Sequence, residues 1–568
     1  MASRAREPIG RPQGVDLWAR AAAMTTGNPT SLSETWSKVE ELLKRRDPEK
    51  EPYKSRYEAL KLLRDARKAL EGNEGETEVK ARAALDHRIG LTKISVEERG
   101  EGEEVLLGCL DAMREREDDF VHQLQEAWNA LGIVCFERDL TSRALEYLKL
   151  AEDVYQRRPE DASPNHFCLT LFYLAQAYSN LGEAELGAKY CALTLDSQLR
   201  AGTYATHDWA QNAVQLAGFY LDKARFATAH NLLEAAGEVL RRGAGHQEDS
   251  TPAGGSEGDV PANVSLGWAK LGLRVLVAAK EWKLGGGREE ERGDHEEVEE
   301  EVQPELRFET LALRQSPHLG RSALFLDFEA ARECFNEAMR RFNEALDHYK
   351  LDGWVTEHFQ ISMEVSALYK ALAVFERDPH RICVMHRKRA KRIELISEDL
   401  NPKYFPSIHK STLLELADVY REIMDVKARC GRPDGKVFRA GRESARRYRA
   451  FLEAIDGEEG GGGAESLEED DLLYYIKARF ELGRILHKLQ GCSPEGAEAR
   501  KGYLAESLGH LQWIEDFTGK HGEARAPPSI ISRLLVLTIS SLYLLFPFSL
   551  SPRQTWRGSS KRGRSASR

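Results

Sequence analysis

The stretch LFYLAQAYSNLGEAELGAKYCALTLDSQL, residues 171–199, decides the fold of this chain. Apolar and small residues recur in it at helical spacing, the pattern breaks at Leu181 and Gly182, and a second run of the same kind follows. Two amphipathic helices joined by a tight turn cannot bury their apolar faces alone. The stretch therefore predicts a helical hairpin that packs on neighbouring hairpins.

This hairpin belongs to a series with the tetratricopeptide (TPR) pattern. Residues 128–151, WNALGIVCFERDLTSRALEYLKLA, follow W-x2-L-G-x2-Y and then A-x3-F-x2-A, with cysteine and leucine at two of the aromatic positions. A small residue at the eighth position of the first helix lets the second helix pack closely. These small residues stand 42, 43 and 42 positions apart: Gly90, Gly132, Ala175 and Ala217. The period exceeds the usual TPR length of about 34 residues, so we expect lengthened helices or loops.

The expected fold is an all-α, TPR-like right-handed α-solenoid of antiparallel helix pairs. Runs of Gly, Pro, Ser and acidic residues without periodicity mark the breaks. We expect a disordered N-terminal extension at 1–30, TPR-like repeats at 31–240, a linker at 241–263, a connecting helix at 264–284, an acidic and Gly-rich disordered loop at 285–320, further TPR-like repeats at 321–523 and an atypical apolar, then basic tail at 524–568.

Composition restricts the classes of partner. The chain has 92 acidic and 81 basic side chains, for a formal charge of -11, which disfavours bulk nucleic-acid binding and suits a basic protein partner. Its eight cysteines are scattered singly, without zinc-site spacing, and are expected to be reduced core residues. The N-terminus lacks a secretory apolar region. We expect no nucleic-acid partner, no metal and no cofactor.

Catalytic motifs are missing as well. The glycine clusters at 285–287 and 460–463 lack the Gly-Lys-Ser/Thr of a P-loop, and HEEVE at 295–299 lacks the second histidine of a metalloprotease helix. No G-x-S-x-G elbow occurs. The basic run MHRKRAKR, 385–392, fits either a nuclear or nucleic-acid signal or a solvated basic helix face, and we favour the helix face. The chain is therefore not expected to be an enzyme.

Several longer strings resemble one family, the kinesin-binding proteins. DPEKEPYKSRY at 47–57 resembles the family's NPEKEPYKS, and FYLAQAYS at 172–179 resembles YYLAQVYQ. Four further strings match in the same order: KYCALTLDSQL at 189–199, DFEAAREC at 327–334, LDGWVTEH at 351–358 and DLNPKYF at 399–405. The resemblance covers about 31–521 and implies a cytoplasmic, cytoskeleton-associated TPR protein that binds kinesin motor domains and blocks their attachment to microtubules.

TPR geometry places one face of each first helix on a concave surface. In the central hairpin this face carries Leu169, Phe172, Gln176, Ser179 and Asn180, and its neighbours add Asn129, Ile133, Gln211 and Val214. Amides beside apolar side chains suit a groove for a partner helix. Exposed polar residues are also common on any surface, so simple solvation stays an alternative.

The resemblance gives individual residues a role in that groove. It implies that Tyr173, Gln176 and Gln198 contact the motor's microtubule-binding helix. Gln215 stands where the family carries a threonine, which leaves that contact in doubt. The alternative function is a general TPR scaffold or chaperone-associated adaptor for extended peptides. Its carboxylate clamp needs positive charge, which Asn129, Gln176 and Asn180 do not supply.

The C-terminal tail departs from the family after residue 524. Its apolar stretch 530–550 is long enough for a membrane helix. Arg533, Pro547 and several serines disfavour insertion. We therefore do not assign a membrane anchor. The other explanation for the change in sequence after residue 524 is an alternatively spliced or mistranslated tail.

Overall fold

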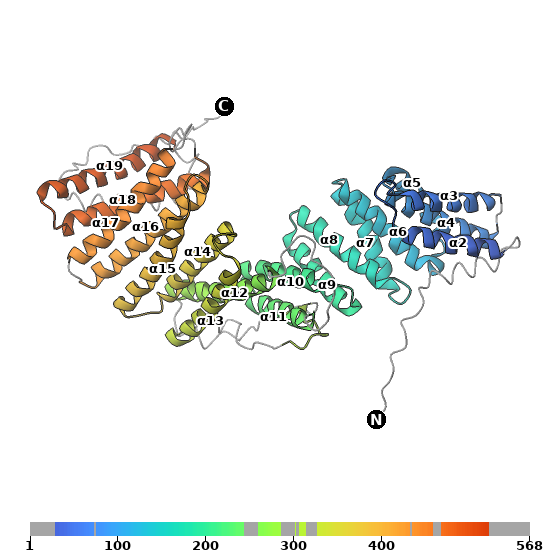
Figure 1. Ribbon diagram of the computed structural model, residues 1–568, viewed down its shortest axis with the longest axis horizontal. Helices are drawn as coiled ribbons and strands as arrows, with labels where there is room; N and C mark the ends of the chain where they lie inside the picture. The colour runs from blue at the N-terminus through green and yellow to red at the C-terminus, as the bar shows by residue number, and fades with distance from the viewer. Residues whose placement is uncertain are drawn as a thin grey trace, which may run out of the picture. The chain divides into compact units, whose positions relative to one another are not determined.

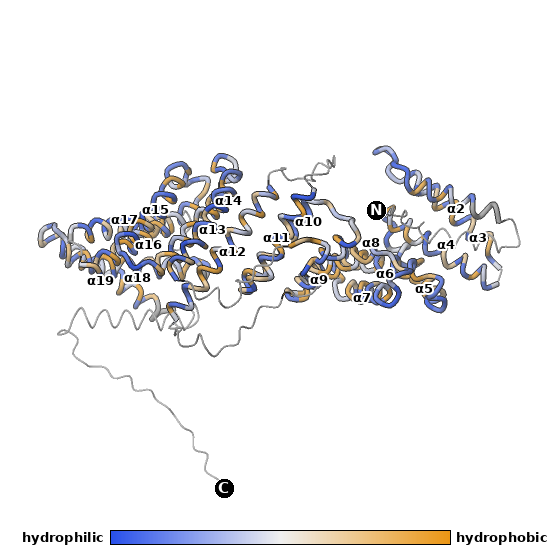
Figure 2. Tube along the Cα trace, turned by 90° about the horizontal axis from the view of Figure 1, so that it is seen from below, coloured by the Kyte–Doolittle hydropathy of each residue, from blue (hydrophilic) through white to orange (hydrophobic). Residues whose placement is uncertain are grey.

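The computed structural model describes residues 29–72, 75–243, 259–285, 302, 306–313, 327–431, 434–457 and 467–521. Within these ranges it contains eighteen α-helices, α2 to α19 (Figure 1), and no strand. Consecutive helices pack in antiparallel pairs, and hydrophilic and hydrophobic residues are interspersed along the helices (Figure 2). The predicted all-α, TPR-like arrangement of helix pairs is confirmed.

The chain divides into two compact units, Met1–Leu271 with Arg292–Ala323 and Gly272–Glu291 with Leu324–Arg568. The first unit holds α2 (Pro29–Lys44), α3 (Lys54–Ala69), α4 (Glu76–Ser95), α5 (Arg99–Arg114), α6 (Glu117–Glu137), α7 (Thr141–Arg157), α8 (Pro164–Asn180), α9 (Ala184–Ala201), α10 (Thr206–Asp222) and α11 (Phe226–Gly243). The second holds α13 (Phe328–His348), α14 (Val355–Leu372), α15 (Pro379–Asp399), α16 (Pro406–Arg429), α17 (Asp434–Asp456), α18 (Glu469–Cys492) and α19 (Ala497–His521). Helix α12 (Asp259–Leu284) contributes residues to both units.

Two helix pairs in the first unit approach closely at the glycines of the repeat. A β-carbon on Gly132 of α6 would lie 2.7 Å from Cγ of Leu148 on α7, and one on Gly90 of α4 would lie 2.7 Å from Cγ of Leu106 on α5. Both leucines are fully buried. The glycines therefore leave the space that a leucine of the second helix fills, as the sequence pattern predicts.

Four hairpin turns of this unit share one backbone geometry. Each contains a residue with positive φ: Glu97 (69°), Asp139 (59°), Gly182 (77°) and Ala224 (55°). In each turn the next residue donates its N–H to a carbonyl five positions earlier, as Glu183 does to Tyr178 at 2.9 Å. This bond satisfies a carbonyl that the helix end leaves free. The four turn residues repeat at the same 42, 43 and 42 positions as the small residues, so the whole hairpin is the unit of repetition.

The segment 306–311 packs on the first unit, although the range 285–320 was expected to be disordered. Its Phe308 ring is fully buried and meets Trp209 of α10 edge to face, with ring centres 5.5 Å apart. The side-chain amide of Asn231 on α11 donates to a main-chain carbonyl of the segment. The expectation is wrong here because three apolar side chains follow the acidic run and bury themselves against α10 and α11.

Helix also occupies both ends of the expected linker at 241–263. Helix α11 continues to Gly243, and α12 begins at Asp259. Its third residue, Pro261, is tolerated because it lies in the first turn of the helix. Helix α2 already begins at Pro29, inside the expected extension. The rest of that extension, the acidic run at 286–301 and the apolar tail at 530–550 lie outside the described residues.

A row of carboxylates runs along one face of α16 in the second unit. Glu415, Asp418, Glu422 and Asp425 recur three or four positions apart, which places them on one side of the helix. Their partners are Arg389 of α15 for Glu415 and Glu422, Tyr448 of α17 and Lys477 of α18 for Asp418, and Arg484 and Lys488 of α18 for Asp425. Arg389 is only 1% exposed. A charge buried to that extent requires these partners, so the row holds α15, α17 and α18 against α16.

The close approach at Gly132 gives a stability test. Gly132→Leu should lower the free energy of unfolding by about 1 to 3 kcal/mol, because the added side chain must displace Leu148 from a packed site. Thermal and urea unfolding followed by circular dichroism measure the change. Gly108→Leu on α5 is the matched control, since its new side chain enters open space and leucine favours helix. Equal stabilities of the two variants would contradict this packing.

The turn geometry gives a second test. Ala224→Gly should stabilise the chain by up to about 1 kcal/mol, since φ of 55° strains an alanine and glycine relieves that strain at a smaller entropic cost. Gly182→Ala, at the matching turn, should destabilise by a similar amount. Chemical denaturation of both variants checks the opposite signs, and a shared sign would refute the left-handed turns.

Candidate functional site

Helix α8 presents the residues that the sequence places in a groove. Its start is set by Pro164 at the first helical position and by the Ser163 hydroxyl, which accepts a hydrogen bond from the His166 N–H at 3.3 Å. Its end is set by Gly182 in the left-handed conformation. One side of the helix, including Leu171 and Leu174, is buried against its neighbours. The other side is free for contact.

A line of apolar and amide side chains occupies that free side, and we call it the α8 stripe. It consists of Leu169, Phe172, Gln176 and Asn180, spaced three or four residues apart. All four are exposed, Leu169 to 39% and Phe172 to 43%. Two large apolar groups in water beside two amides form a surface that can bury area and donate or accept hydrogen bonds.

Tyr173 supports the stripe from the inside. Its half-buried ring packs edge to face against Phe172 at 5.3 Å and against Phe136 of α6 at 5.6 Å. Burial raises the pKa of the Tyr173 hydroxyl, which therefore stays protonated near neutral pH. The three rings connect the exposed face of α8 to the neighbouring hairpin and restrict the orientation of Phe172.

Asn129 lies inside the protein, so the prediction that it lines the open surface is wrong. It is 2% exposed; its amide donates to the His166 carbonyl at 2.9 Å and accepts from the Thr170 hydroxyl at 2.8 Å. One turn earlier, Gln125 exchanges two hydrogen bonds with the main chain of Ser163. The next hairpin covers both amides, and they hold the first turns of α8 against α6.

The other predicted residues lie on the neighbouring helices α9 and α10. Gln198 is half-buried near the end of α9, and its neighbour Ser197 contacts Cys168 in the first turns of α8 with its hydroxyl 3.1 Å from the sulfur. Gln198 is therefore nearer to the Leu169 end of the stripe than to Asn180, which is twelve residues, or about 18 Å along the helix, after Cys168. Gln215 is exposed on α10. The structure brings together Phe172, Tyr173, Gln176 and Asn180, and no contact joins them to Gln198 or Gln215 among the hydrogen bonds and ring contacts of the described residues.

Sequence reasoning missed Phe136 as part of this surface. The repeat pattern contains the signal that would have found it. Phe136 comes eight residues after Trp128, so it occupies the same repeat position as Ser179, which the sequence places on the concave face. The signal was overlooked because the residue type differs between the repeats. A position-by-position comparison of the first helices would have found the Phe136–Tyr173 contact.

A histidine cluster lies among α4, α6 and α8, with His87 buried and His122 and His166 half-buried. His87 Nε2 is 3.7 Å from a Glu126 oxygen, and the rings of His122 and His166 lie 5.0 Å apart. Burial lowers the pKa of His87 to about 4, and it also lowers the pKa of His166. Within the described residues, no group of three or more His, Cys, Asp or Glu side chains is arranged to hold a metal ion.

The basic run at 385–392 forms the middle of α15, and it does not make one solvated face. Arg387 and Lys388 are exposed, whereas His386 and Arg389 are buried. The expectation of a basic helix face is wrong in this respect because eight consecutive residues cover every side of a helix with 3.6 residues per turn.

The cysteines differ in burial. Cys383 is buried, as expected for a core residue, but Cys430 is exposed.

The described helices also include none that is long and apolar enough to cross a membrane.

The chain is similar over most of its length to a group of related proteins. Residues 207–530 match the family model described as "KIF-1 binding protein C terminal". The KIF-binding protein of Gallus gallus is 30% identical over 544 residues, with 84% of this chain and 90% of that protein covered. The KIF-binding protein of Homo sapiens is 29% identical over 574 residues, with 84% and 91% covered. The cryo-EM map of KIFBP matches with a TM-score of 0.59 at 26% identity and covers 90% of this chain and 96% of that chain.

The histidine cluster predicts a loss of stability in acid. His87 is neutral in the folded state, whereas the unfolded chain binds the proton near pH 6.5, so its contribution is present above pH 6.5 and lost as the pH falls toward 4. The loss is about 1.4 kcal/mol per unit of pKa shift. Urea unfolding at a series of pH values between 4 and 6.5 measures the free energy of unfolding. This free energy should fall less steeply with decreasing pH for His87→Gln than for the wild type. His380→Gln, at an exposed histidine, is the control; an unchanged slope for His87→Gln would contradict the prediction.

Proposed function

The chain belongs to the KIF-binding protein family, and from that membership we propose that it captures kinesin motor domains on the α8 stripe and performs no chemistry of its own. Binding would cover the motor surface that otherwise attaches to microtubules, so the protein would regulate microtubule-based transport in the cytoplasm by keeping motors off their track. The observation that carries the proposal is the exposed apolar and amide stripe on a family member.

The stripe has the composition of a helix-binding surface. Leu169 and Phe172 supply apolar area that a partner can bury, and Gln176 and Asn180 supply hydrogen bonds that fix its register. A handful of such residues usually carries most of the binding energy of an interface, with aromatic anchors prominent among them.

Charge favours a basic partner for the chain as a whole. Helices α6, α8 and α10 contain no lysine or arginine. Helix α6 carries five acidic residues: Glu117, Asp118, Asp119, Glu126 and Glu137. Four of these carboxylates are paired with cations of other helices: Glu117 with Arg157, Asp118 with Arg158, Asp119 with Lys80 and Glu137 with Arg99. A basic partner is therefore favoured by the formal charge of -11 on the whole chain, which speeds association with a positively charged surface at low salt.

The same absence of cations argues against the second candidate function, a TPR adaptor for extended C-terminal peptides. Binding a peptide carboxylate requires lysine or arginine side chains on the first helices. None occurs on the three helices of this surface.

Removing the stripe should abolish competition with microtubules. Phe172→Ala combined with Gln176→Ala should weaken binding of a kinesin motor domain by about 2 kcal/mol or more, a roughly 30-fold loss, because an aromatic anchor and its neighbouring amide disappear. Both side chains are exposed, so helicity and melting temperature should not change. Co-sedimentation of motor with microtubules measures the effect: the wild type should release the motor, and the double variant should not.

A matched pair of leucines controls for general loss of apolar surface. Leu169 on the stripe and Leu186 on α9 are 39% and 40% exposed. Leu169→Ala should weaken motor binding, and Leu186→Ala should not. Equal release of the motor by all variants would place the binding surface elsewhere.

A further inference from the structure

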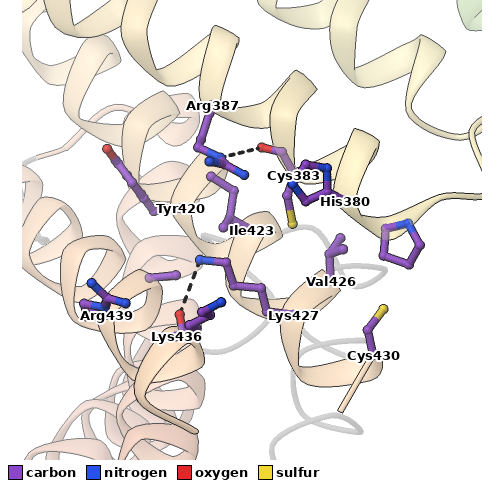
Figure 3. A pocket seen from close by; sticks show the side chains of 12 residues that line it. His380, Cys383, Arg387, Tyr420, Ile423, Val426, Lys427, Cys430, Lys436 and Arg439 are labelled. Carbon is purple, nitrogen blue, oxygen red and sulfur yellow. Dashed lines mark hydrogen bonds between the residues drawn. The ribbon is translucent and has the colours of Figure 1, made fainter. Parts of the chain in front are cut away.

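The second unit contains a cavity of about 480 Å³ formed by α15, α16 and α17 (Figure 3). Its floor is apolar and buried, and is made by Cys383, Ile423, Val426 and Ala440. The volume falls within the range of about 300–1,000 Å³ typical of ligand sites. We call this cavity the basic pocket, for the side chains of its rim.

Four cationic side chains surround the floor: Arg387 from α15, Lys427 from α16, and Lys436 and Arg439 from α17. Lys427 is half-buried and the other three are exposed. No aspartate or glutamate is among the described residues that line the pocket. Burial and the neighbouring Arg387, Arg439 and Lys436 lower the pKa of Lys427, as expected where positive charges gather without compensation.

The hydrogen bonds of these cations leave their charge unneutralised. Arg387 Nε donates to the Cys383 carbonyl at 3.3 Å, Lys427 Nζ to the Lys436 carbonyl at 3.3 Å (Figure 3), and Arg439 Nε to the Gly435 carbonyl at 3.4 Å. Main-chain carbonyls orient the groups but carry no net charge.

Three other arginines on the same three helices are paired with carboxylates. Arg389 pairs with two carboxylates, Arg421 lies among Asp418, Asp425 and Glu481, and Arg447 pairs with Glu443 and Glu394. Glu394, which lies beside the pocket residue Tyr420, accepts from the Tyr420 hydroxyl at 2.8 Å and also pairs with Arg447. The four rim cations, by contrast, share one cavity whose described lining includes no carboxylate.

We propose that the basic pocket binds an acidic peptide segment, which places an apolar side chain on the floor and its carboxylates against Arg387, Lys427, Lys436 and Arg439. An apolar floor below an exposed cationic rim requires both features in one ligand. Arginine forks pair with carboxylates through two hydrogen bonds, and the apolar floor gains nothing from a purely ionic ligand. The site lies in the second unit and does not use the α8 stripe, so it is a second binding surface with an independent test.

Fluorescence anisotropy with the full chain and labelled peptides tests the proposal. The probe is Glu-Glu-Leu-Glu-Glu, compared with the same peptide carrying serine in place of leucine and with Lys-Lys-Leu-Lys-Lys. We expect the acidic peptide with leucine to bind, the serine peptide to bind more weakly, the basic peptide not to bind, and affinity to fall with added salt.

Charge reversal at the rim separates the pocket from general attraction. Arg387→Glu with Arg439→Glu should reduce affinity for the probe by about tenfold or more. Arg442→Glu with Arg446→Glu is the control: it makes the same change in net charge at two exposed α17 residues that do not line the pocket. Circular dichroism verifies that both double variants fold.

Three outcomes would overturn the proposal. Equal loss of affinity in the two double variants would assign binding to overall charge. Equal binding of the leucine and serine peptides would remove the role of the floor. Displacement of the peptide by an equal concentration of inorganic tripolyphosphate would identify a simple anion site, in which the peptide is not the preferred ligand.

Discussion

The close approach of two helices at one small residue is the constraint on which the first unit depends. At Gly132 the backbone of α6 lies against Leu148 of α7, and Gly90 and Leu106 repeat the arrangement in the preceding hairpin. Seven residues after each small residue comes a turn residue with positive φ, such as Asp139. Wider helix spacing would prevent the turn from closing with its hydrogen bond, so packing and turn geometry repeat together.

This packing leaves one face of α8 uncommitted, and side-chain chemistry decides what that face can do. On α8 it exposes apolar groups and amides without positive charge. In the second unit charged side chains are used to join helices instead, since carboxylates along α16 bind cations from α15 and α18. The rim of the basic pocket is where such compensation is missing among the described side chains. Exposed apolar area on the α8 stripe and uncompensated positive charge at the rim of the basic pocket are the two features that suit binding.

Much of the candidate site could be predicted, because helical spacing alone puts Phe172, Gln176 and Asn180 on one side of a helix. Asn129 occupies an equivalent position in the repeat and is nevertheless buried. Spacing specifies the direction of a side chain from its own axis, and it contains no information on whether the next hairpin covers it. The same limit applies to Arg389, which reads as part of a basic surface run but is enclosed by Glu415 and Glu422.

The sequence by itself determined the all-α class, the repeat period, the small residues at the helix crossings and the direction of the α8 stripe, because each depends on periodicity within one or two neighbouring helices. It did not reveal that 306–311 packs on α10 and α11, that Asn129 ties two hairpins together, or that Arg387, Lys427, Lys436 and Arg439 share one cavity. Those facts depend on contacts between residues far apart in the chain. Only the tertiary structure decides which groups meet there, since burial and charge compensation are properties of the assembled neighbours.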